Sequence, residues 1–178
     1  MKIKIRRSCN DDIDKIFNLH NICFSKNDCW YKSAISNYVD SGIVIEIVDS
    51  KEIIGVLLQG NILPCSDSFF DSKDELIELN KESDLGEGFI KDNLHKKEHM
   101  GIVMICIHPE YRNKGLAKKL INKHFNDNKG KLVCLNTRKS NHKAISLYKS
   151  LGYDHIGNIP NKYFLPNEDS VFMIKLLD

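Results

Sequence analysis

The stretch 100-MGIVMICIHPEYRNKGLAKKLI-121 joins an apolar run to a cationic segment with helical periodicity. Residues 100–107 are almost continuously apolar, which predicts a strand buried on both faces, and Pro109 ends it. From about Lys114 to Asn126 the apolar side chains recur at the spacing of a helix. The predicted inner face of that helix consists of Leu116, Leu120, Ile121 and His124 or Phe125. The stretch therefore predicts a strand, a short connection and a helix.

The remainder of the chain adds strands and helices on both sides of this unit. In chain order they are a strand at 2–7, a helix within 8–24, a weak helix at 29–39, a hairpin of strands 43–48 and 53–60, a strand at 131–137, a helix from about 142 to 151 that stops at Gly152, and strands 153–157 and 170–177 joined by a loop with Pro and Asn. Within 8–24, the residues near helical spacing are Ile13, Ile16, Phe17, Leu19 and Ile22. This order predicts one mixed α/β domain over residues 1–178.

The composition is that of an ordinary soluble globular protein, with 42% hydrophobic and 28% charged residues. No apolar run approaches the roughly 18 to 20 residues of a membrane span, and the basic start MKIKIRRSCNDD lacks the apolar core of a secretory signal. The six cysteines are Cys9, Cys23, Cys29, Cys65, Cys106 and Cys134. None forms a C-x-x-C pair, so we expect no metal site and no disulfide framework. We expect a cytoplasmic protein with reduced thiols and no membrane partner.

The net charge of +2 is unevenly distributed along the chain. Residues 61–98 contain five basic and ten acidic residues, whereas residues 99–178 contain thirteen basic and six acidic ones. The acidic segment is too long for a simple connection, so we interpret it as an insertion, with a possible short helix at 74–79. Two hypotheses remain for it: a solvated, variable loop, or a surface that attracts a cationic acceptor. The cationic part of the chain suits an anionic ligand.

The connection that precedes the central helix is a candidate anion site. A strand that ends at Pro109 and a helix that begins near Lys114 leave backbone N–H groups unpaired, and the helix dipole favours negative charge there. Gly115 would let a pyrophosphate approach the backbone closely, and Arg112 adds positive charge. A surface helix with solvated cations is the alternative. The chain has no G-x-x-x-x-G-K-S/T and no G-x-G-x-x-G after a strand, which excludes a P-loop and a Rossmann nucleotide site.

A second motif, 141-NHKAISLYKSLGY-153, follows about twenty residues later. Together with 105-ICIHPEYRNKGLAKKLI-121 it resembles the GNAT superfamily of N-acetyltransferases. The family's acetyl-CoA motif, Q/R-x-x-G-x-G/A, is matched by Arg112, Gly115 and Ala117. Its second signature, N-x-x-A-x-x-L/F-Y-x-x-x-G-F/Y, is matched by Asn141, Ala144, Leu147, Tyr148, Gly152 and Tyr153. The resemblance implies a single-domain GNAT fold with a mixed, mostly antiparallel sheet of about seven strands flanked by about four helices.

Within the superfamily the pattern is closest to the N-terminal protein acetyltransferases, including the type that acetylates the alanine of a ribosomal protein. The tail 158-NIPNKYFLPNEDSVFMIKLL-177 resembles their last hairpin, and 161-NKYF-164 takes the place of two aromatics that close over a peptide N-terminus. The segment 22-ICFSKNDCW-30 departs from their substrate loop, because it lacks a proline and has a longer spacer. The acceptor specificity of that group is therefore not carried over.

The resemblance implies that acetyl-CoA is the cofactor and lies in an opening between strands 100–107 and 131–137. It implies that the backbone groups of Ile105, Cys106 and Ile107 pair with the pantetheine. The implied diphosphate-binding residues are Arg112, Asn113, Lys114, Gly115, Leu116 and Ala117. Asn141 is implied to contact the pantetheine arm; a helix N-cap is the plain alternative, and the two roles are compatible.

For catalysis, the resemblance implies direct attack of an amine on the thioester through a tetrahedral intermediate. Tyr148 is implied as a cofactor contact and as the acid that protonates the leaving thiolate, since phenol and thiol pKa values lie near about 10 and 8.5. Asn136 takes the place, five residues before the motif asparagine, where relatives often carry a Glu or His base. An amide accepts no proton at neutral pH, so we interpret Asn136 as orienting a water or the amine. Weaker candidates for the base are His99, His108 and Asp154.

These motifs together predict an acetyl-CoA-dependent N-acetyltransferase that acts on a primary amine, foremost the α-amine of a protein or peptide. Two alternatives remain: a small-amine or polyamine acceptor, and a non-catalytic acyl-CoA-binding protein. We expect no nucleic-acid partner, because the basic C-terminal third has no interleaved aromatic patch. A monomer and a homodimer are both compatible with the sequence.

Overall fold

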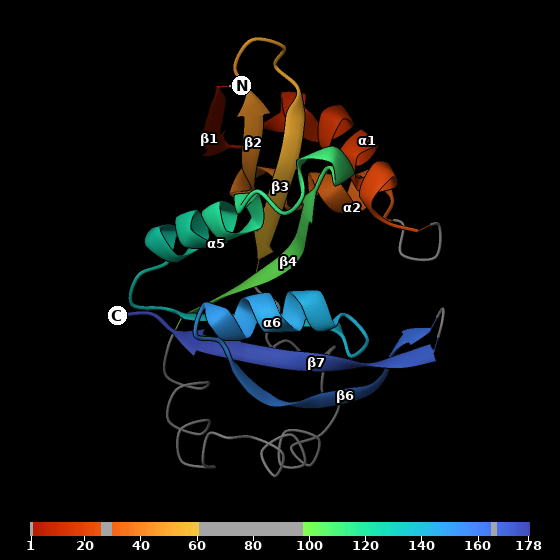
Figure 1. The fold of residues 1–178 in the computed structure, drawn as a ribbon, viewed down its shortest axis with the longest axis vertical. Helices are drawn as coiled ribbons and strands as arrows, with labels where there is room; N and C mark the ends of the chain where they lie inside the picture. Colours follow the sequence, from red (N-terminus) through yellow and green to blue (C-terminus); the bar gives the residue numbers. More distant parts are fainter. Residues whose placement is uncertain (1, 26–29, 61–97, 165–166) are drawn as a thin grey trace. The chain divides into compact units, whose positions relative to one another are not determined.

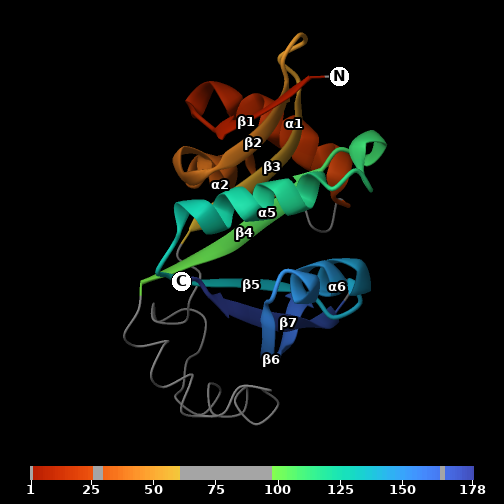
Figure 2. The ribbon, with the colours of Figure 1, turned by 60° about the vertical axis from the view of Figure 1, so that its left-hand side comes forward.

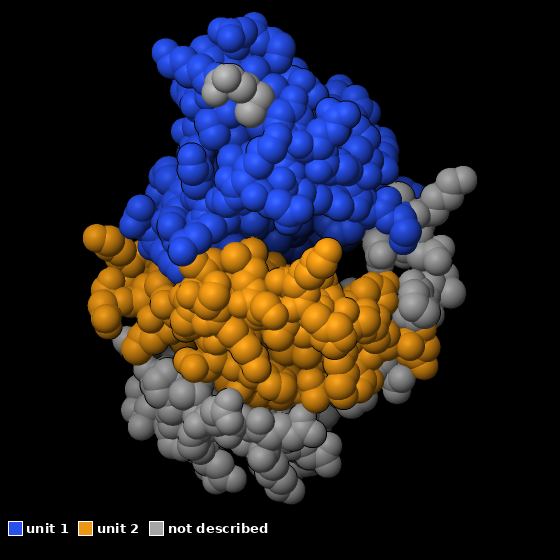
Figure 3. All heavy atoms as spheres, in the orientation of Figure 1, with its two compact units in different colours: residues 1–60, 102–127 blue, residues 61–101, 128–178 orange. Residues whose placement is uncertain are grey.

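The computed structural model describes residues 2–25, 30–60, 98–164 and 167–178 (Figure 1). The chain divides into two compact units, which Figure 3 shows in different colours. The first consists of Met1–Gly60 and Ile102–Asp127, and the second of Asn61–Gly101 and Asn128–Asp178. Across the described ranges there are seven strands and four α-helices, which confirms the predicted mixed α/β fold class.

The first unit follows the strand order β1-β2-β3-β4. Its strands are β1 (Ile3–Arg7), β2 (Ile43–Ile47), β3 (Ile53–Gly60) and the larger part of β4 (His99–Ile107). Its helices are α1 (Ile13–Cys23), α2 (Lys32–Ser36) and α5 (Leu116–Asp127), with 3-10 turns at Asn10–Asp12, Val39–Ser41 and Pro109–Tyr111. The pairs β1–β2 and β2–β3 are antiparallel, so the predicted hairpin is confirmed.

Strands β2 and β3 are buried along almost their whole length because helices cover both of their faces. One face contributes Val44 and Val56 to an apolar cluster with Ile16 of α1. Helix α5 packs on the same two strands (Figure 2). It contributes Leu120, which is fully buried. Each such side chain contributes roughly 1.5–3 kcal/mol when it is fully removed from water. The core of the first unit therefore lies on both faces of its sheet.

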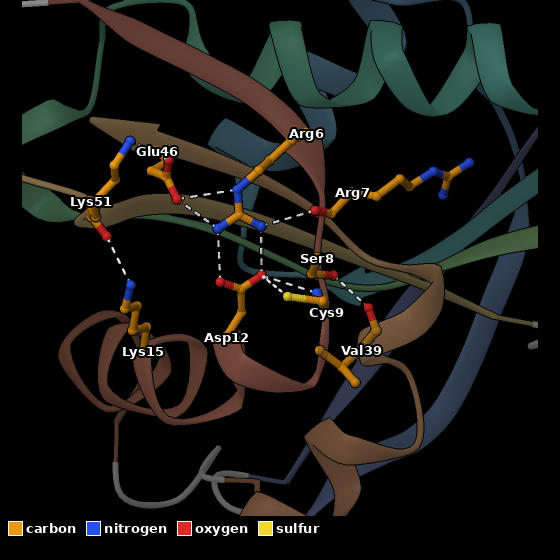
Figure 4. A network of polar contacts seen from close by, with 9 residues as sticks. All are labelled: Arg6, Arg7, Ser8, Cys9, Asp12, Lys15, Val39, Glu46 and Lys51. Carbon is orange, nitrogen blue, oxygen red and sulfur yellow. Dashed lines mark hydrogen bonds and ion pairs between the residues drawn. The ribbon is translucent and has the colours of Figure 1, made fainter. Parts of the chain in front are cut away.

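A buried ion cluster joins β1, β2 and the start of α1 (Figure 4). The guanidinium of Arg6 donates to both oxygens of Asp12, at 2.6 and 2.8 Å, and to Oε2 of Glu46, at 3.1 and 2.6 Å. The two carboxylate side chains are only 3% and 8% exposed. The hydrogen bonds from Arg6 lower the pKa of both carboxyl groups, so both are ionised at neutral pH. Arg6 thus compensates both buried anions, and Lys51 adds a longer ion pair of 4.0 Å to the other oxygen of Glu46.

Helix α5 begins two residues later than predicted. Asn113 and Gly115 have φ angles of +60° and +72°, in the left-handed region that a right-handed helix excludes. The helix therefore starts at Leu116. Its inner face contains His124 rather than Phe125, because the fully buried imidazole forms a hydrogen bond of 2.5 Å with Gln59 through Nδ1.

The second unit contains three antiparallel strands and one helix in its described part. The strands are β5 (Leu132–Arg138), β7 (Asn167–Leu176) and β6 (Asp154–Phe164), in that spatial order. Helix α6 (His142–Ser150) follows β5 in the chain. Cys134 and Phe172 form an apolar cluster with neighbours from the same strands. Gly152, with a φ of +79°, ends the helix as predicted.

The prediction of a loop between residues 157 and 170 is wrong. Strand β6 continues to Phe164 and β7 begins at Asn167, and the two strands pair antiparallel up to that position. Proline and asparagine made this segment look like a loop in the sequence. The strands instead accommodate it by a register shift between Ile159 and Tyr163, which interrupts the regular ladder without ending it.

The structure also bears on the predicted short helices, the cysteines and the absence of a membrane span. The weak helix predicted at 29–39 is confined to Lys32–Ser36. The possible helix at 74–79, and the acidic segment except Glu98, lie outside the described residues. Cys9, Cys23, Cys106 and Cys134 are free thiols, whereas Cys29 and Cys65 lie outside the described part. Among the helices of the described ranges, none has both the length and the apolar character to cross a membrane.

Candidate active site

The connection after β4 is held by a short series of hydrogen bonds. The His108 amide donates to the Ile54 carbonyl at 2.9 Å, and the Tyr111 amide donates to the His108 carbonyl at 2.9 Å. Arg112 then folds back, and its Nε donates to the Ile107 carbonyl at 3.0 Å. The last carbonyl of β4 is thereby tied to the residue that opens the predicted anion loop.

The loop itself presents a run of free backbone donors. Among the hydrogen bonds of the described residues, none is donated by the amides of residues 113–118, and the first amide of α5 with a partner is that of Lys119, which bonds Gly115. A Cβ built on Gly115 would meet no atom of the chain within 4 Å. The left-handed φ makes glycine the favoured residue there, and the open space beside it leaves the amides accessible to an anion.

Cationic side chains lie at the same loop, and one of them is already engaged. The Lys114 ammonium donates to the Glu110 carbonyl at 3.1 Å and lies 5.2 Å from the centroid of the Tyr111 ring. Arg112 is exposed, and its Nε donates to the Ile107 carbonyl. Free amides, an open glycine and two cations fit a diphosphate in shape and charge.

The carbonyl of Ile107 has a second donor that the sequence did not suggest. The thiol of Cys23, at the end of α1, donates to it at 3.3 Å. A hydrogen bond from Cys106, followed by the nearby Arg112, lowers the pKa of Cys23 to about 7, against partial burial that acts in the opposite direction. Spacing alone could not identify this residue, because α1 and β4 lie far apart in the chain.

In the second unit, Asn141 is the N-cap of α6. Its Oδ1 accepts a hydrogen bond from the Ala144 amide at 3.3 Å, so the plain capping role is confirmed. The side-chain amide nitrogen is not used by the cap. A contact of that nitrogen with pantetheine stays a prediction.

The turn before Asn141 is fixed by a residue that sequence reasoning missed. Glu168 accepts hydrogen bonds from the Ser140 amide at 2.5 Å and from Arg138 at 3.3 Å. The hydrogen bonds from Ser140 lower the pKa of Glu168, which keeps it ionised. The Arg138 carbonyl in turn accepts from the Asn141 amide at 2.9 Å. This contact secures the start of α6 to β7.

Tyr148 is 5% exposed on α6 and lies against Tyr153, with ring centroids 5.7 Å apart in an edge-to-face arrangement. Burial raises the pKa of Tyr153 well above its usual value, and the neighbouring Tyr148 adds to that shift. The Tyr148 ring is therefore part of the packing of α6. Its role as an acid is compatible with this packing and stays a prediction.

Asn136 lies in β5, half-buried, opposite Phe172 of β7. Its Oδ1 accepts a long hydrogen bond of 3.5 Å from Ser170, whose side chain is fully buried. The sheet therefore holds this amide in one place. A held amide can orient a ligand but cannot take up a proton at neutral pH.

The three weaker base candidates differ in their surroundings. His108 accepts from the Glu110 amide through Nδ1 at 3.4 Å and packs edge-on against Tyr111. His99 is half-buried at the first residue of β4, and Asp154 is exposed at the first residue of β6. These contacts identify no base.

The predicted residues fall into two groups. Residues 105–107 and 112–117 belong to the first unit, where Arg112 ties the two segments to each other. Asn136, Asn141 and Tyr148 belong to the second unit. The side chains of the two predicted aromatics in 161-NKYF-164 lie outside the described part of the structure.

Comparison with known proteins bears on the family and the fold of the chain. The sequence profile of the acetyltransferase (GNAT) family matches residues 13–153. An N-alpha-acetyltransferase of Saccharolobus solfataricus is 25% identical over 97% of this chain and 92% of its own length. The structure of NAA60 from Arabidopsis thaliana in complex with acetyl-CoA has a TM-score of 0.75 at 18% identity, covering 99% of this chain and 100% of that one. The ribosomal-protein-S18-alanine N-acetyltransferase of Escherichia coli has a TM-score of 0.70 at 16% identity, covering 99% and 95%.

Proposed function

The chain belongs to the acetyltransferase (GNAT) family and uses acetyl-CoA, and from that premise we propose that it acetylates the N-terminal α-amine of a protein or peptide. The observation that carries this proposal is the likeness to an N-alpha-acetyltransferase over 97% of the chain. It agrees with the two sequence motifs, each of which lies on the element expected of it.

The proposed cofactor contacts in the first unit follow from the free donors of the loop. The amides of 113–118 and the guanidinium of Arg112 would hold the diphosphate, and the end of β4 at Ile105, Cys106 and Ile107 would pair with pantetheine. When bound, acetyl-CoA supplies the acetyl thioester that the amine attacks. Asn141 would contribute its remaining amide donors from the second unit.

Tyr148 and Asn136 are the proposed catalytic residues. The Tyr148 hydroxyl would give its proton to the departing thiolate, a transfer that the ordinary pKa values make unfavourable by only about 2 kcal/mol. Asn136, held by Ser170, would orient the acceptor amine or a water that takes up its proton. No side-chain base is assigned, since an amide at position 136 cannot be one.

The proposal is tested by following thiol release from acetyl-CoA with three acceptors. One is a short peptide with a free α-amine and a lysine, the second is the same peptide with its α-amine blocked, and the third is spermidine. We expect turnover with the free peptide alone. Turnover with the blocked peptide would assign lysine acetylation instead, and turnover with spermidine would assign a polyamine acceptor.

The same preparation separates catalysis from binding. Thermal stabilisation by coenzyme A establishes that the cofactor is bound, whatever the acceptor. Stabilisation by coenzyme A without thiol release on any of the three acceptors would favour a non-catalytic acyl-CoA-binding protein and would contradict the proposal.

A further inference from the structure

The first residues of β7 hold the turn that leads from β5 into α6. One oxygen of the Glu168 carboxylate, Oε1, accepts from the Ser140 amide at 2.5 Å, and the other, Oε2, accepts from Nη1 of Arg138 at 3.3 Å. The next residue of the strand, Asp169, accepts from the Lys139 amide at 3.1 Å through its backbone carbonyl. The connection between β5 and α6 is short, so these bonds fix most of it.

Asn141 ends this connection and caps α6. Its backbone amide donates to the Arg138 carbonyl at 2.9 Å, and its Oδ1 accepts from the Ala144 amide at 3.3 Å. The cap leaves the side-chain nitrogen for the contact proposed with pantetheine. Ser140, whose amide Glu168 holds, is the residue directly before Asn141. A shift of that amide therefore moves the cap and its side-chain nitrogen as well.

The arrangement at Glu168 requires a carboxylate. Two donors approach the side chain from different residues, and each is bound by its own oxygen. The hydrogen bonds from Ser140 lower the pKa of Glu168, so the group is ionised at neutral pH and accepts both bonds. Glutamine has the same shape but only one acceptor oxygen beside an NH2 group, so one of the two donors would face another donor. Glu168→Gln therefore releases one side of the turn without changing the volume of the side chain.

The other end of α6 is held by a different residue of β7. The Lys175 ammonium donates to the Leu151 carbonyl at 2.8 Å, just after the helix. Tyr148 packs against Tyr153 within the same part of the chain. Loss of the Glu168 carboxylate should therefore loosen the start of α6 and leave Tyr148 in place.

We propose that Glu168 is a positioning residue of the acetyl-CoA site: by holding the turn between β5 and α6, it places the Asn141 side-chain amide for its contact with pantetheine. The proposal rests on the cofactor contact of the proposed function and not on the identity of the acceptor. The carboxylate acts through Asn141 and takes no part in the chemical step. Its loss weakens the binding of coenzyme A and does not slow acetyl transfer once the cofactor is bound.

Isothermal titration calorimetry with coenzyme A compares the unaltered full chain with Glu168→Gln. We expect Kd to rise about fivefold, which corresponds to the loss of one hydrogen bond between neutral groups. Glu98→Gln is the matched control, because its carboxylate is 81% exposed and pairs with Lys131 at 3.0 Å, at the other end of β5. It removes the same charge from the same unit and should leave Kd unchanged. An unchanged Kd in Glu168→Gln, or an equal rise in both variants, would overturn the proposal.

Asn141→Ser separates positioning from a general loosening of the unit. Serine keeps an oxygen that can cap the helix and removes the amide donors. When Glu168→Gln is added to this variant, binding should weaken no further, because the group that Glu168 positions is already gone. In Glu168→Gln alone, kcat at saturating acetyl-CoA should stay within about twofold of the unaltered chain. A further rise in Kd in the double variant, or a fall in kcat as large as the rise in Kd, would indicate general loosening and contradict the proposal.

The same titrations distinguish failure of this role from failure of the proposed function. If the unaltered chain does not bind coenzyme A, the proposed cofactor site fails, and the role of Glu168 fails with it. If the unaltered chain and Glu168→Gln bind coenzyme A alike, only the role of Glu168 fails. The calorimetry needs no acceptor, so it decides the role of Glu168 even if the peptide α-amine is not the substrate.

Discussion

Replacing Gly115 by alanine separates the cofactor role of the anion loop from its role in folding. Gly115 has a φ of +72°, and a Cβ there would meet no atom of the chain within 4 Å. The folding cost is therefore the left-handed conformation alone, about 1–2 kcal/mol for a residue with a Cβ. The reduced entropy of the unfolded chain offsets roughly half of that. We expect a net loss near 1 kcal/mol, or a fall in Tm of about 2–4 °C.

The chain offers a matched control in Gly130. It has a φ of +76°, and a Cβ there would also meet nothing within 4 Å. Gly130→Ala should therefore lower Tm by a similar amount. The control lies in the turn between α5 and β5, and helix α5 separates it in the chain from the free amides of 113–118. The difference between the two variants thus reports on the loop and not on backbone strain.

Coenzyme A affinity should fall only in Gly115→Ala. A methyl group beside the free amides would keep the diphosphate from at least one charge-assisted hydrogen bond, which costs about 2 kcal/mol, or roughly thirtyfold in Kd. Isothermal titration calorimetry with coenzyme A measures this, and urea unfolding measures the stability change. Equal affinity of the two variants would refute the assignment of the diphosphate to this loop.

Three further predictions follow from other parts of the molecule. Arg6→Met leaves the buried Asp12 without its cation and Glu46 with only the longer ion pair to Lys51, so urea unfolding at neutral pH should show a loss of about 3–5 kcal/mol; a loss below 1 kcal/mol would contradict the cluster. Burial lowers the pKa of His124 to about 4 from an ordinary 6.5. Between pH 7 and 5 the imidazole therefore takes up a proton in the unfolded chain but not in the folded one, so the free energy of unfolding should fall by about 2 kcal/mol over that range. His124→Gln should reduce this dependence of the free energy of unfolding on pH, and an unchanged dependence would contradict the role of His124. Tyr148→Phe should lower kcat by about 10²-fold or more, whereas Tyr153→Phe, its ring partner, should not; similar losses would indicate packing rather than proton transfer.

Features that depend on neighbouring residues could be predicted from the sequence. The β2–β3 hairpin and the end of α6 at Gly152 follow from alternation and from a glycine with positive φ. The N-cap at Asn141 follows from a residue type at a fixed spacing, whereas anion binding by residues 112–117 stays a prediction. In each case the determining groups lie within one turn or one strand.

Features that depend on distant pairs could not be predicted. Cys23 reaches Ile107 across 84 positions, Arg6 reaches Glu46 across 40, and no periodicity indicates either contact. The inner face of α1 shows the same limit: Ile22 fits the helical spacing yet is 54% exposed. The loop predicted before β7 failed because pairing with β6 outweighs the local preference of proline and asparagine.

The central claim is that the chain transfers an acetyl group to a peptide α-amine. The most direct measurement incubates the protein and acetyl-CoA with one peptide that carries both a free α-amine and a lysine, and locates the added acetyl group by tandem mass spectrometry. We expect the acetyl group on the N-terminal residue and a lysine that stays unmodified. An acetyl group on the lysine alone, or none while thiol is still released to a small amine, would contradict it.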